Sequence, residues 1–374
     1  MPFCRHRCGY CDFATSAVGD DDSLFDRYTV ALVTALETSI DDPDGTGTLP
    51  GVGDRTVTSV FVGGGTPSLL GAARLGRVLD ALRDCIEVAP DAEVTVECNP
   101  EDVSHDVFAG LAAHGVDRVS MGAQSFSEQV LTQLERGHDA RRPLDAVAEA
   151  RDAGIERISL DLIYGAPTET DASWLETVDV AATSGVDHLS AYALTIHDNT
   201  PFGTAAREGR MHVDDDVLAD RFDLVRQRLA AHGFDHYEVS NFSRGAAARS
   251  RHNVLYWRHG DHLGVGVGAH GHLDGTRWWS TRSTGRWLEA VESSVSPVAD
   301  HEHLDLVQQA TERLLLGLRL REGLHPHDVP PIDALALQEA LDAGLVTTAC
   351  GRLQCTEQGW FLLDEAVRRL TPNA

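Results

Sequence analysis

The sequence predicts an α/β fold, in which a partial barrel of β/α units is followed by a small α+β domain of winged-helix type. Two observations support this prediction. Between residues 56 and 240, short β-branched runs alternate with amphipathic stretches of helical length, which is the pattern of a parallel sheet. Near the C-terminus, the phrase GLVTTACGRLQCTEQGWFLLDEAVRRL is typical of a helix, two strands and a closing helix. With 374 residues, the chain has room for two or three domains of roughly 150 residues each.

The runs expected to form strands, and the stretches expected to form helices, follow each other in order. The strands are predicted at residues 57–62, 93–97, 118–121, 157–163, 188–194 and 236–239. The helices between them are predicted at residues 72–85, 107–114, 144–153, 174–184 and 217–232. Four helices are followed directly by glycine, which favours the left-handed conformation at a helix C-cap. These glycines are Gly115, Gly154, Gly185 and Gly233.

Polar and glycine residues follow several of the expected strands. Residues 63–67 (GGGTP) follow the first run, Glu97 closes the second, Gln124 lies just beyond the third, and Asp161 lies near the end of the fourth. Because functional groups of a β/α barrel lie past the C-terminal ends of its strands, we expect these residues to meet at one edge of the sheet.

The composition excludes several classes of protein. With 58 acidic and 31 basic residues the net charge is −27, which disfavours binding to nucleic acid or to an anionic membrane surface. No run approaches the roughly 18 apolar residues of a membrane helix, and the start lacks the apolar core of a signal peptide. We therefore expect a cytoplasmic protein with no integral membrane segment, whose seven cysteines are reduced and available for a metal or for catalysis.

Three of the cysteines are clustered near the N-terminus. Cys4, Cys8 and Cys11 have the spacing C-x3-C-x2-C. A structural zinc ion needs four ligands, so it would require His6 or another residue as the fourth. A cluster of four irons and four sulfides accepts three thiolates and leaves one iron open. The spacing favours the cluster, with zinc and a loop without metal as alternatives.

The motif, with the aromatic Tyr10 before its last cysteine and a glycine-rich loop after the next strand, resembles the radical S-adenosylmethionine (SAM) superfamily. In that superfamily the open iron binds the amino and carboxylate groups of SAM, and one electron cleaves SAM to a 5′-deoxyadenosyl radical. The resemblance implies a (β/α)6-type partial barrel, here with its first strand missing. Within the superfamily, the chain resembles the coproporphyrinogen oxidase-like branch over nearly its whole length. Phrases that carry this resemblance include FVGGGTPSLL, VECNPE, SMGAQSF, LDLIYGAP and RHNVLYW.

The resemblance also implies which residues contact SAM. Transferred by motif, they are Tyr10, Gly64, Gly65, Thr66, Glu97, Gln124, Arg136, Asp161 and Ala193. The residue types suit this ligand, since Glu97 and Arg136 can pair with a zwitterionic amino acid and carboxylate or amide oxygens can bind ribose hydroxyls. The alternative is structural: Glu97 and Asp161 as helix caps, Arg136 in a surface ion pair, and the glycines in a tight turn.

Two functions compete within this branch. The oxygen-independent coproporphyrinogen III oxidases carry a further cysteine where this chain has Phe13. The haem-chaperone relatives, of the HemW type, lack that cysteine and have an H-N-x-x-Y-W motif, matched here by His252, Asn253, Tyr256 and Trp257. A neutral imidazole is a good axial ligand of haem iron. By itself, a histidine near two aromatic residues is more often part of the core than of a cofactor site. The resemblance favours a haem chaperone that delivers haem to apo-haemoproteins of the respiratory chain and uses an electron donor. The alternatives are an oxidase and a zinc-stabilised binding module.

The expected domains are a core at residues 1–240, a Gly-, His- and Trp-rich extension at 241–300, and the winged-helix-like domain at 301–374. Relatives usually have a strand just before P-F-C, whereas this chain begins with Met1-Pro2-Phe3. We therefore expect a cysteine loop that is anchored on one side only and retains its cluster weakly, because ordering such a loop costs more entropy.

Overall fold

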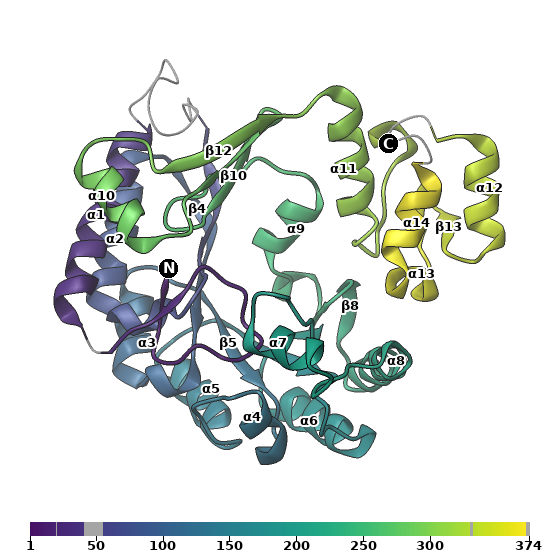
Figure 1. Cartoon of the computed structure of the whole chain (residues 1–374), viewed down its shortest axis with the longest axis horizontal. Coiled ribbons are helices and arrows are strands. Elements are labelled where there is room, and N and C mark those ends of the chain that lie inside the picture. Colours follow the sequence, from purple (N-terminus) through teal and green to yellow (C-terminus); the bar gives the residue numbers. More distant parts are fainter. Residues whose placement is uncertain (20, 41–54, 330–331, 372–374) are drawn as a thin grey trace.

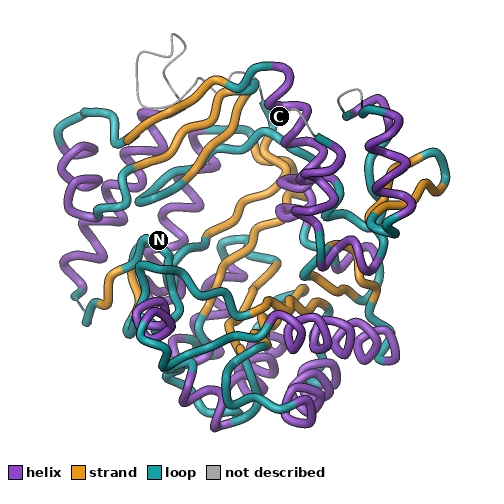
Figure 2. Tube along the Cα trace, turned by 45° about the vertical axis from the view of Figure 1, so that its right-hand side comes forward, coloured by secondary structure: helices purple, strands orange, loops and turns teal. Residues whose placement is uncertain are grey.

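A sheet of seven strands forms the centre of the molecule (Figures 1 and 2). The computed structural model describes residues 1–19, 21–40, 55–329 and 332–371. The strand order is β3-β4-β5-β6-β7-β9-β8, and the first five strands are parallel. The strands are β3 (Val57–Val62), β4 (Val88–Cys98), β5 (Arg118–Gln124), β6 (Arg157–Tyr164), β7 (His188–Ala193), β8 (Asp235–Glu238) and β9 (Asn241–Ser243).

Helices cover the outer face of this sheet, as expected for β/α units. They are α1 (Asp22–Ile40), α2 (Gly71–Cys85), α3 (His105–Ala113), α5 (Arg142–Asp152), α6 (Asp171–Thr183) and α8 (Asp215–Ala231). Their apolar residues meet the sheet in one continuous core, in which Phe108, Met121, Leu160 and Trp174 are fully buried. Two short helices, α4 (Glu128–Gln133) and α7 (Pro201–Arg207), contribute to a separate apolar cluster that includes Val130 and Phe202. The four glycines expected as C-caps all have positive φ, for example +90° at Gly154. The predicted α/β half-barrel is therefore confirmed.

One predicted strand joins the sheet differently from the prediction. Residues 236–239 were expected to add another parallel strand, but β8 forms a hairpin with β9, and β9 lies antiparallel between β8 and β7. The reason is the link: only Val239 and Ser240 separate the two strands, and a parallel neighbour requires a crossover of a dozen or more residues.

The extension after the sheet contains helix α9 (Arg251–Trp257) and an antiparallel sheet of β10 (His270–Leu273), β11 (Thr276–Ser280) and β12 (Val298–His303). Helix α10 (Thr284–Glu292) lies beside α1 in Figure 1, where Arg27 and Glu292 form an ion pair with N–O distances of 2.6 and 2.7 Å. Strand β12 crosses the boundary that we proposed near residue 300.

The C-terminal segment has a core of its own. It contains α11 (Leu306–Gly317), α12 (Ala334–Asp342), β13 (Val346–Ala349), β14 (Arg352–Cys355), α13 (Glu357–Phe361) and α14 (Leu363–Leu370). Leu314, Leu345 and Val367 meet in its core. Trp360 connects this segment to the barrel, because its indole contacts the ring of His236 at 4.5 Å. The predicted helix, hairpin and closing helix are present. Among the described helices, none is long and apolar enough to cross a membrane.

Candidate functional site

The three clustered cysteines lie on a loop that is closed by backbone hydrogen bonds. Cys4 lies on the short strand β1 (Phe3–Cys4), which pairs with β2 (Ser16–Ala17), and Cys8 and Cys11 lie on the loop between these strands. The amide of Cys11 donates to the carbonyl oxygen of Cys8 at 3.1 Å, which turns both cysteines back within one tight loop. All three thiols are free.

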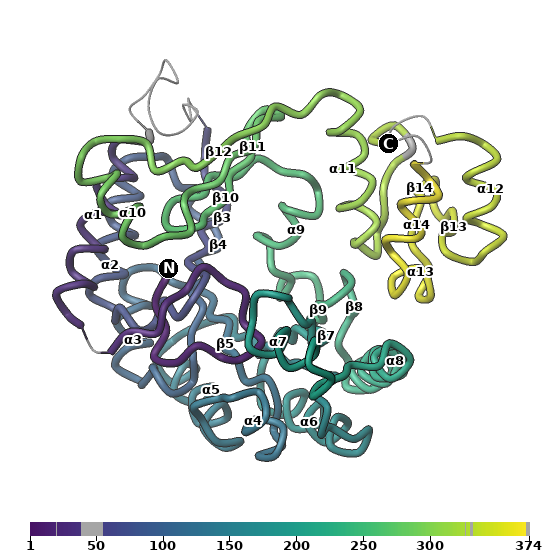
Figure 3. The backbone as a smooth tube through the Cα atoms, viewed as in Figure 1, coloured from purple at the N-terminus to yellow at the C-terminus, as the bar shows by residue number. Residues whose placement is uncertain are grey.

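The N-terminal segment is held on both sides of the loop, so the expectation of one-sided anchoring was wrong. The Gly65 amide donates to the Met1 carbonyl oxygen and the Thr66 amide donates to the Phe3 carbonyl oxygen, both at 2.7 Å. Farther along, the amide of Phe202 in α7 donates to the carbonyl oxygen of Gly9 at 3.0 Å. Figure 3 shows this segment passing close to α7. These bonds keep the cysteines at the carboxyl edge of the sheet, because Gly65 and Thr66 directly follow β3.

The number of thiols on the loop is the feature that bears on the two kinds of metal site. A structural zinc ion takes four protein ligands, whereas a four-iron cluster accepts three thiolates and leaves one iron open. Cys4, Cys8 and Cys11 are three free thiols on one loop, which is the number that the cluster needs.

Arg136 supplies positive charge beside the cysteine loop. Its Nη1 donates to the sulfur of Cys8 at 3.5 Å, while Nη2 donates to Asn99 Oδ1 at 2.9 Å and to the Gly122 carbonyl oxygen at 3.0 Å. Its buried Nε has no partner within the described chain and is left for an acceptor such as a ligand carboxylate. The surface ion pair considered for Arg136 is therefore not what the structure contains.

Glu97 lies opposite the glycine loop at the end of β4. It accepts a hydrogen bond from the Gly64 amide at 2.8 Å, and burial raises the pKa of its carboxyl to about 7. A Cβ placed on Gly63 would fall 2.8 Å from Glu97 Oε2, and Gly64 has a φ of +116°. Glycine is needed here both for the backbone conformation and for the close approach of the carboxylate. A buried carboxyl with a raised pKa is well placed to receive an amino group.

Asp161 and Thr66 complete the strand-end set. Ser120 donates to the two oxygens of Asp161 at 3.1 and 3.0 Å, and burial raises the pKa of Asp161. Asn99 Nδ2 donates to Thr66 Oγ1 at 2.9 Å, which connects the glycine loop through Asn99 to Arg136. Asp161 lies within β6, so the helix-cap alternative does not apply to it.

Three expected SAM residues have separate positions on the same edge. Tyr10 packs against Phe202, with ring centroids 6.1 Å apart, and burial raises its pKa. Gln124 ends β5 with a φ of +62°, a conformation that few residues other than glycine adopt. Ala193 is the last residue of β7 and so lies at the same edge of the sheet as the other expected SAM residues.

Sequence reasoning left Asn99, Ser120 and Gly122 out of the set of residues expected to contact SAM, although it noted Asn99 at the end of its strand. A Cβ on Gly122 would fall 2.5 Å from Gln124 Nε2 and 3.3 Å from Arg136 Nη2, so this glycine keeps space for both side chains. The phrases VECNPE and SMGAQSF contain all three residues, and reading every polar or glycine position along β5 and just after β4 would have found them.

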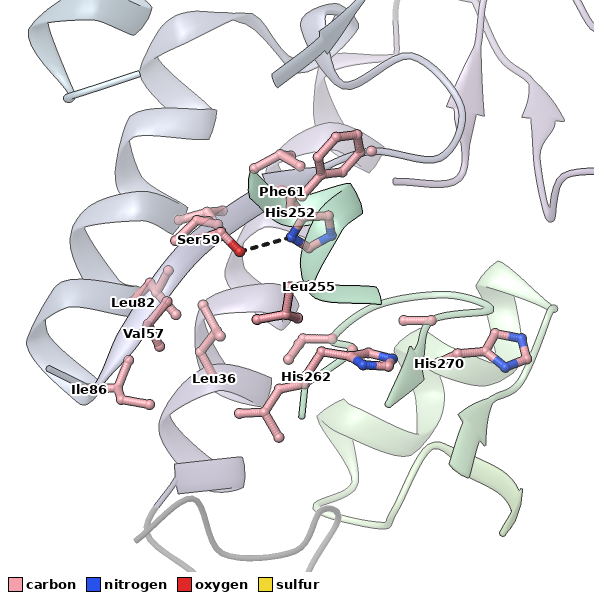
Figure 4. A pocket seen from close by; sticks show the side chains of 18 of the residues that line it. Leu36, Val57, Ser59, Phe61, Leu82, Ile86, His252, Leu255, His262 and His270 are labelled. Atoms are coloured by element: carbon pink, nitrogen blue, oxygen red, sulfur yellow. Dashed lines mark hydrogen bonds between the residues drawn. The ribbon is translucent and has the colours of Figure 1, made fainter. Parts of the chain in front are cut away.

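A second candidate site is a pocket of about 770 Å³ beside β3 (Figure 4). Its apolar wall includes Leu36 of α1, Leu82 of α2 and Val57 of β3, and α9 contributes His252, Asn253, Leu255 and Tyr256. This volume lies within the usual range of small-molecule sites, roughly 300–1,000 Å³.

His252 is fixed in this pocket as a neutral imidazole. Its Nδ1 lies 3.1 Å from Ser59 Oγ, and its ring stacks on Phe61 at 4.8 Å with an interplanar angle of 18°. Burial lowers the pKa of His252 to about 4. In the tautomer whose Nδ1 donates its proton to Ser59 Oγ, the lone pair of Nε2 is left for a metal, which is the arrangement of many histidine ligands.

The four residues of the H-N-x-x-Y-W motif do not all face the pocket. Asn253 and Tyr256 line it together with His252. Trp257 instead lies beneath Arg319, whose guanidinium carbon is 4.2 Å from the centre of the indole ring. Trp257 thus contacts the start of the C-terminal segment.

The half-barrel, the cysteine loop and the strand-end network are together the features of a radical SAM protein. The family described as the radical SAM superfamily matches residues 1–181, and the HemN C-terminal domain matches residues 304–362. A protein of Mycobacterium tuberculosis (strain H37Rv) named heme chaperone HemW is 41% identical over 99% of this chain and 93% of its own length. One of Escherichia coli (strain K12) with the same name is 33% identical over 97% of this chain and 94% of its own length.

The chain belongs to the HemW family within the radical SAM superfamily. A solved structure, the coproporphyrinogen III oxidase HemN of Escherichia coli, matches with a TM-score of 0.83 and 21% identity, over 99% of this chain and 88% of that one. At this identity the match shows the fold. Membership of the superfamily implies a [4Fe-4S] cluster and SAM as cofactors, and the thiols and the strand-end donors described above fit both groups.

Proposed function

We propose that this chain is a haem chaperone, which binds haem in the pocket beside β3 and passes it to apo-haemoproteins of the respiratory chain. The observation that carries the proposal is His252, a neutral imidazole with Nε2 unengaged at the wall of an apolar pocket of about 770 Å³. Neutral imidazole is the usual axial ligand of haem, and apolar walls suit the porphyrin faces. The HemW names of its relatives agree with this assignment.

The cysteine loop and the strand-end set have a separate role in this proposal. Cys4, Cys8 and Cys11 hold the [4Fe-4S] cluster, and Glu97 and Arg136 receive the amino and carboxylate groups of SAM. Gln124 and Asp161 would hydrogen-bond its ribose hydroxyls, and Tyr10, Gly64, Gly65, Thr66 and Ala193 would supply the remaining contacts. When bound, the cluster supplies the electron, taken from an electron donor, that cleaves SAM. The cluster and SAM have a supporting or regulatory role in this proposal. A reducing compartment such as the cytoplasm would keep the three thiols from forming disulfides.

Haem titration of the anaerobically purified protein tests the proposal. Replacement of His252 by Ala is expected to weaken haem binding by at least about tenfold, which corresponds to the loss of about 1.4 kcal/mol. His197→Ala is the control, because this histidine is exposed and lies outside the pocket. Equal haem affinity of His252→Ala and His197→Ala would remove His252 as the ligand.

A transfer assay separates a chaperone from a passive haem binder. Haem-loaded protein is mixed with an apo-cytochrome, or with apomyoglobin as an acceptor that only captures dissociated haem. A chaperone is expected to load the cytochrome faster than haem dissociates to apomyoglobin. If the two rates are equal and the protein instead removes carboxylates from coproporphyrinogen III when given SAM and a reductant, the oxidase alternative is correct.

A further inference from the structure

The sulfur of Cys8 has a charged donor beside it. Arg136 Nη1 donates to this sulfur at 3.5 Å, and the Tyr10 hydroxyl lies near both the sulfur and the guanidinium. An arginine side chain is always protonated in proteins. Cys8 is half-buried, so salt and water screen this contact less than they would at the open surface. One of the three thiols of the cysteine loop therefore has a permanent positive charge against it.

Two further bonds fix the direction of the Arg136 guanidinium. Nη2 donates to Asn99 Oδ1 at 2.9 Å and to the Gly122 carbonyl oxygen at 3.0 Å. A Cβ on Gly122 would fall 3.3 Å from Nη2, so a glycine leaves room for this approach. Because the guanidinium is planar and rigid, the bonds at Nη2 also fix the position of Nη1. Arg136 cannot turn away from Cys8 without losing both bonds.

The acidic side chain nearest in effect to Arg136 is engaged elsewhere. The charge of Glu101 acts on Arg136, but Glu101 bonds to His138, whose Nδ1 lies 3.1 Å from Glu101 Oε2. Arg136 Nε is buried and has no partner within the described chain. This nitrogen is the one left for the carboxylate of SAM, so the contact with Cys8 and the contact with SAM use different atoms of Arg136.

A charged donor at a cysteine sulfur changes how readily an iron–sulfur cluster accepts an electron. Reduction adds one negative charge, which spreads over the irons and the sulfurs bound to them. A positive donor stabilises this added charge and so raises the reduction potential, and hydrogen bonds to the sulfurs are among the features that set the potentials of such clusters. Arg136 has both the position and the charge for this effect.

We infer that Arg136 raises the reduction potential of the cluster through its hydrogen bond to Cys8, in addition to binding SAM. The inference rests on the role proposed above for the cysteine loop, and it adds the residue that favours electron uptake from the donor. Towards the cluster, Arg136 is a positioning residue, because Nη1 acts through Cys8. A potential measured without SAM isolates this role from the binding of SAM at Nε.

A redox titration of the anaerobically reconstituted protein, followed by electron paramagnetic resonance without SAM, tests this role. Arg136→Gln removes the charge and is expected to make reduction of the cluster about tenfold less favourable, which lowers the midpoint potential by about 59 mV for one electron. Arg141→Gln is the matched control, because the Arg141 side chain is 75% exposed and its Nε bonds to Asp145 at 2.8 Å. Its midpoint potential should equal that of wild type. An Arg136→Gln protein with the iron, sulfide and midpoint potential of wild type overturns the inference.

Arg136→Lys covers the case in which Arg136→Gln does not retain a cluster. Its ammonium keeps the positive charge but cannot reproduce the bonds of a planar guanidinium. The midpoint potential is expected to fall by less than in a tenfold change, and a value at or above that of wild type contradicts the inference. If wild-type protein takes up no iron and sulfide, the proposed role of the cysteine loop fails as well. A wild-type cluster with unchanged potentials in the variants rejects this inference alone, so the two failures are distinguishable.

Discussion

Gly65 offers the sharpest test of how the cysteine loop is held. A Cβ on this residue would lie 2.5 Å from the carbonyl oxygen of Phe3 and 3.1 Å from the sulfur of Cys4. The first distance is shorter than any normal carbon–oxygen contact, and its partner is backbone, so Gly65→Ala must displace β1. Overpacking of this kind costs about 1–3 kcal/mol, and loss of the bond from Thr66 to Phe3 adds about 1 kcal/mol. We expect the unfolding free energy to fall by about 2–4 kcal/mol.

Two measurements check this prediction. Urea unfolding of the metal-free protein reports the loss of stability, and iron and sulfide per chain after anaerobic reconstitution report the state of the loop. Gly285→Ala is the control, because nothing in the described structure lies within 4 Å of its Cβ, and it begins a helix in which alanine is favourable. The reasoning is refuted if Gly65→Ala matches Gly285→Ala in both stability and iron content.

Three further predictions concern charge, pH and the C-terminal segment. Arg136→Gln removes a charged donor to Cys8 and should weaken SAM binding, measured by anaerobic calorimetry, about 10- to 100-fold. Arg136→Lys keeps the charge and should lose less affinity. Equal SAM affinity of wild type, Arg136→Gln and Arg136→Lys contradicts the role of Arg136. Burial lowers the pKa of His236 to about 3, so the folded protein holds a neutral imidazole. Below pH 6.5 the unfolded chain binds a proton that the folded protein does not, so stability present above pH 6.5 is lost as the pH falls toward 3. His236→Phe should therefore lose less stability than wild type between pH 7.5 and pH 5 in urea unfolding, and parallel losses would exclude His236 as the cause. Trp360→Ala removes the ring contact with His236 and the hydrogen bond of 3.0 Å that the Trp360 indole donates to the Leu318 carbonyl oxygen. It should lower the free energy of unfolding by about 3–5 kcal/mol and split thermal unfolding into two transitions. A single transition would contradict this prediction.

The alternation of strands and helices could be predicted because each β/α unit is a local pattern. The expected strand at residues 57–62 has the same bounds as β3. The strand predicted at 93–97 proved longer, as β4 begins at Val88. Pro90 and Asp91 argue against a strand in isolation, but the pairing of Val57 with Val88 holds this part of the chain extended along β3. Such pairing between distant segments leaves no local signal.

For the residues expected to contact SAM, the sequence could predict a common place at one edge of the sheet. Because parallel strands end at one edge, Glu97, Gln124 and Asp161 could be placed together without any knowledge of the side chains. The hydrogen bonds among them could not be predicted. Asn99 connects Thr66 with Arg136 because β3, β4 and the loop after α4 meet in space, although 37 residues separate Asn99 from Arg136.

The H-N-x-x-Y-W motif shows how helix geometry divides a sequence motif. His252 and Tyr256 are four residues apart on α9 and therefore share one helix face, and the two rings contact each other at 4.6 Å. Trp257 is one residue, or about 100°, farther round the helix and packs under Arg319 instead. The same two-turn helix thus presents an imidazole to the pocket and an indole to the C-terminal segment, whose Arg319 carbonyl oxygen also accepts from the Val239 amide at 3.1 Å. A rotation of α9 that moved His252 within the pocket would have to break the contact between Trp257 and Arg319, so the position of His252 and the docking of the C-terminal segment are coupled through one rigid element.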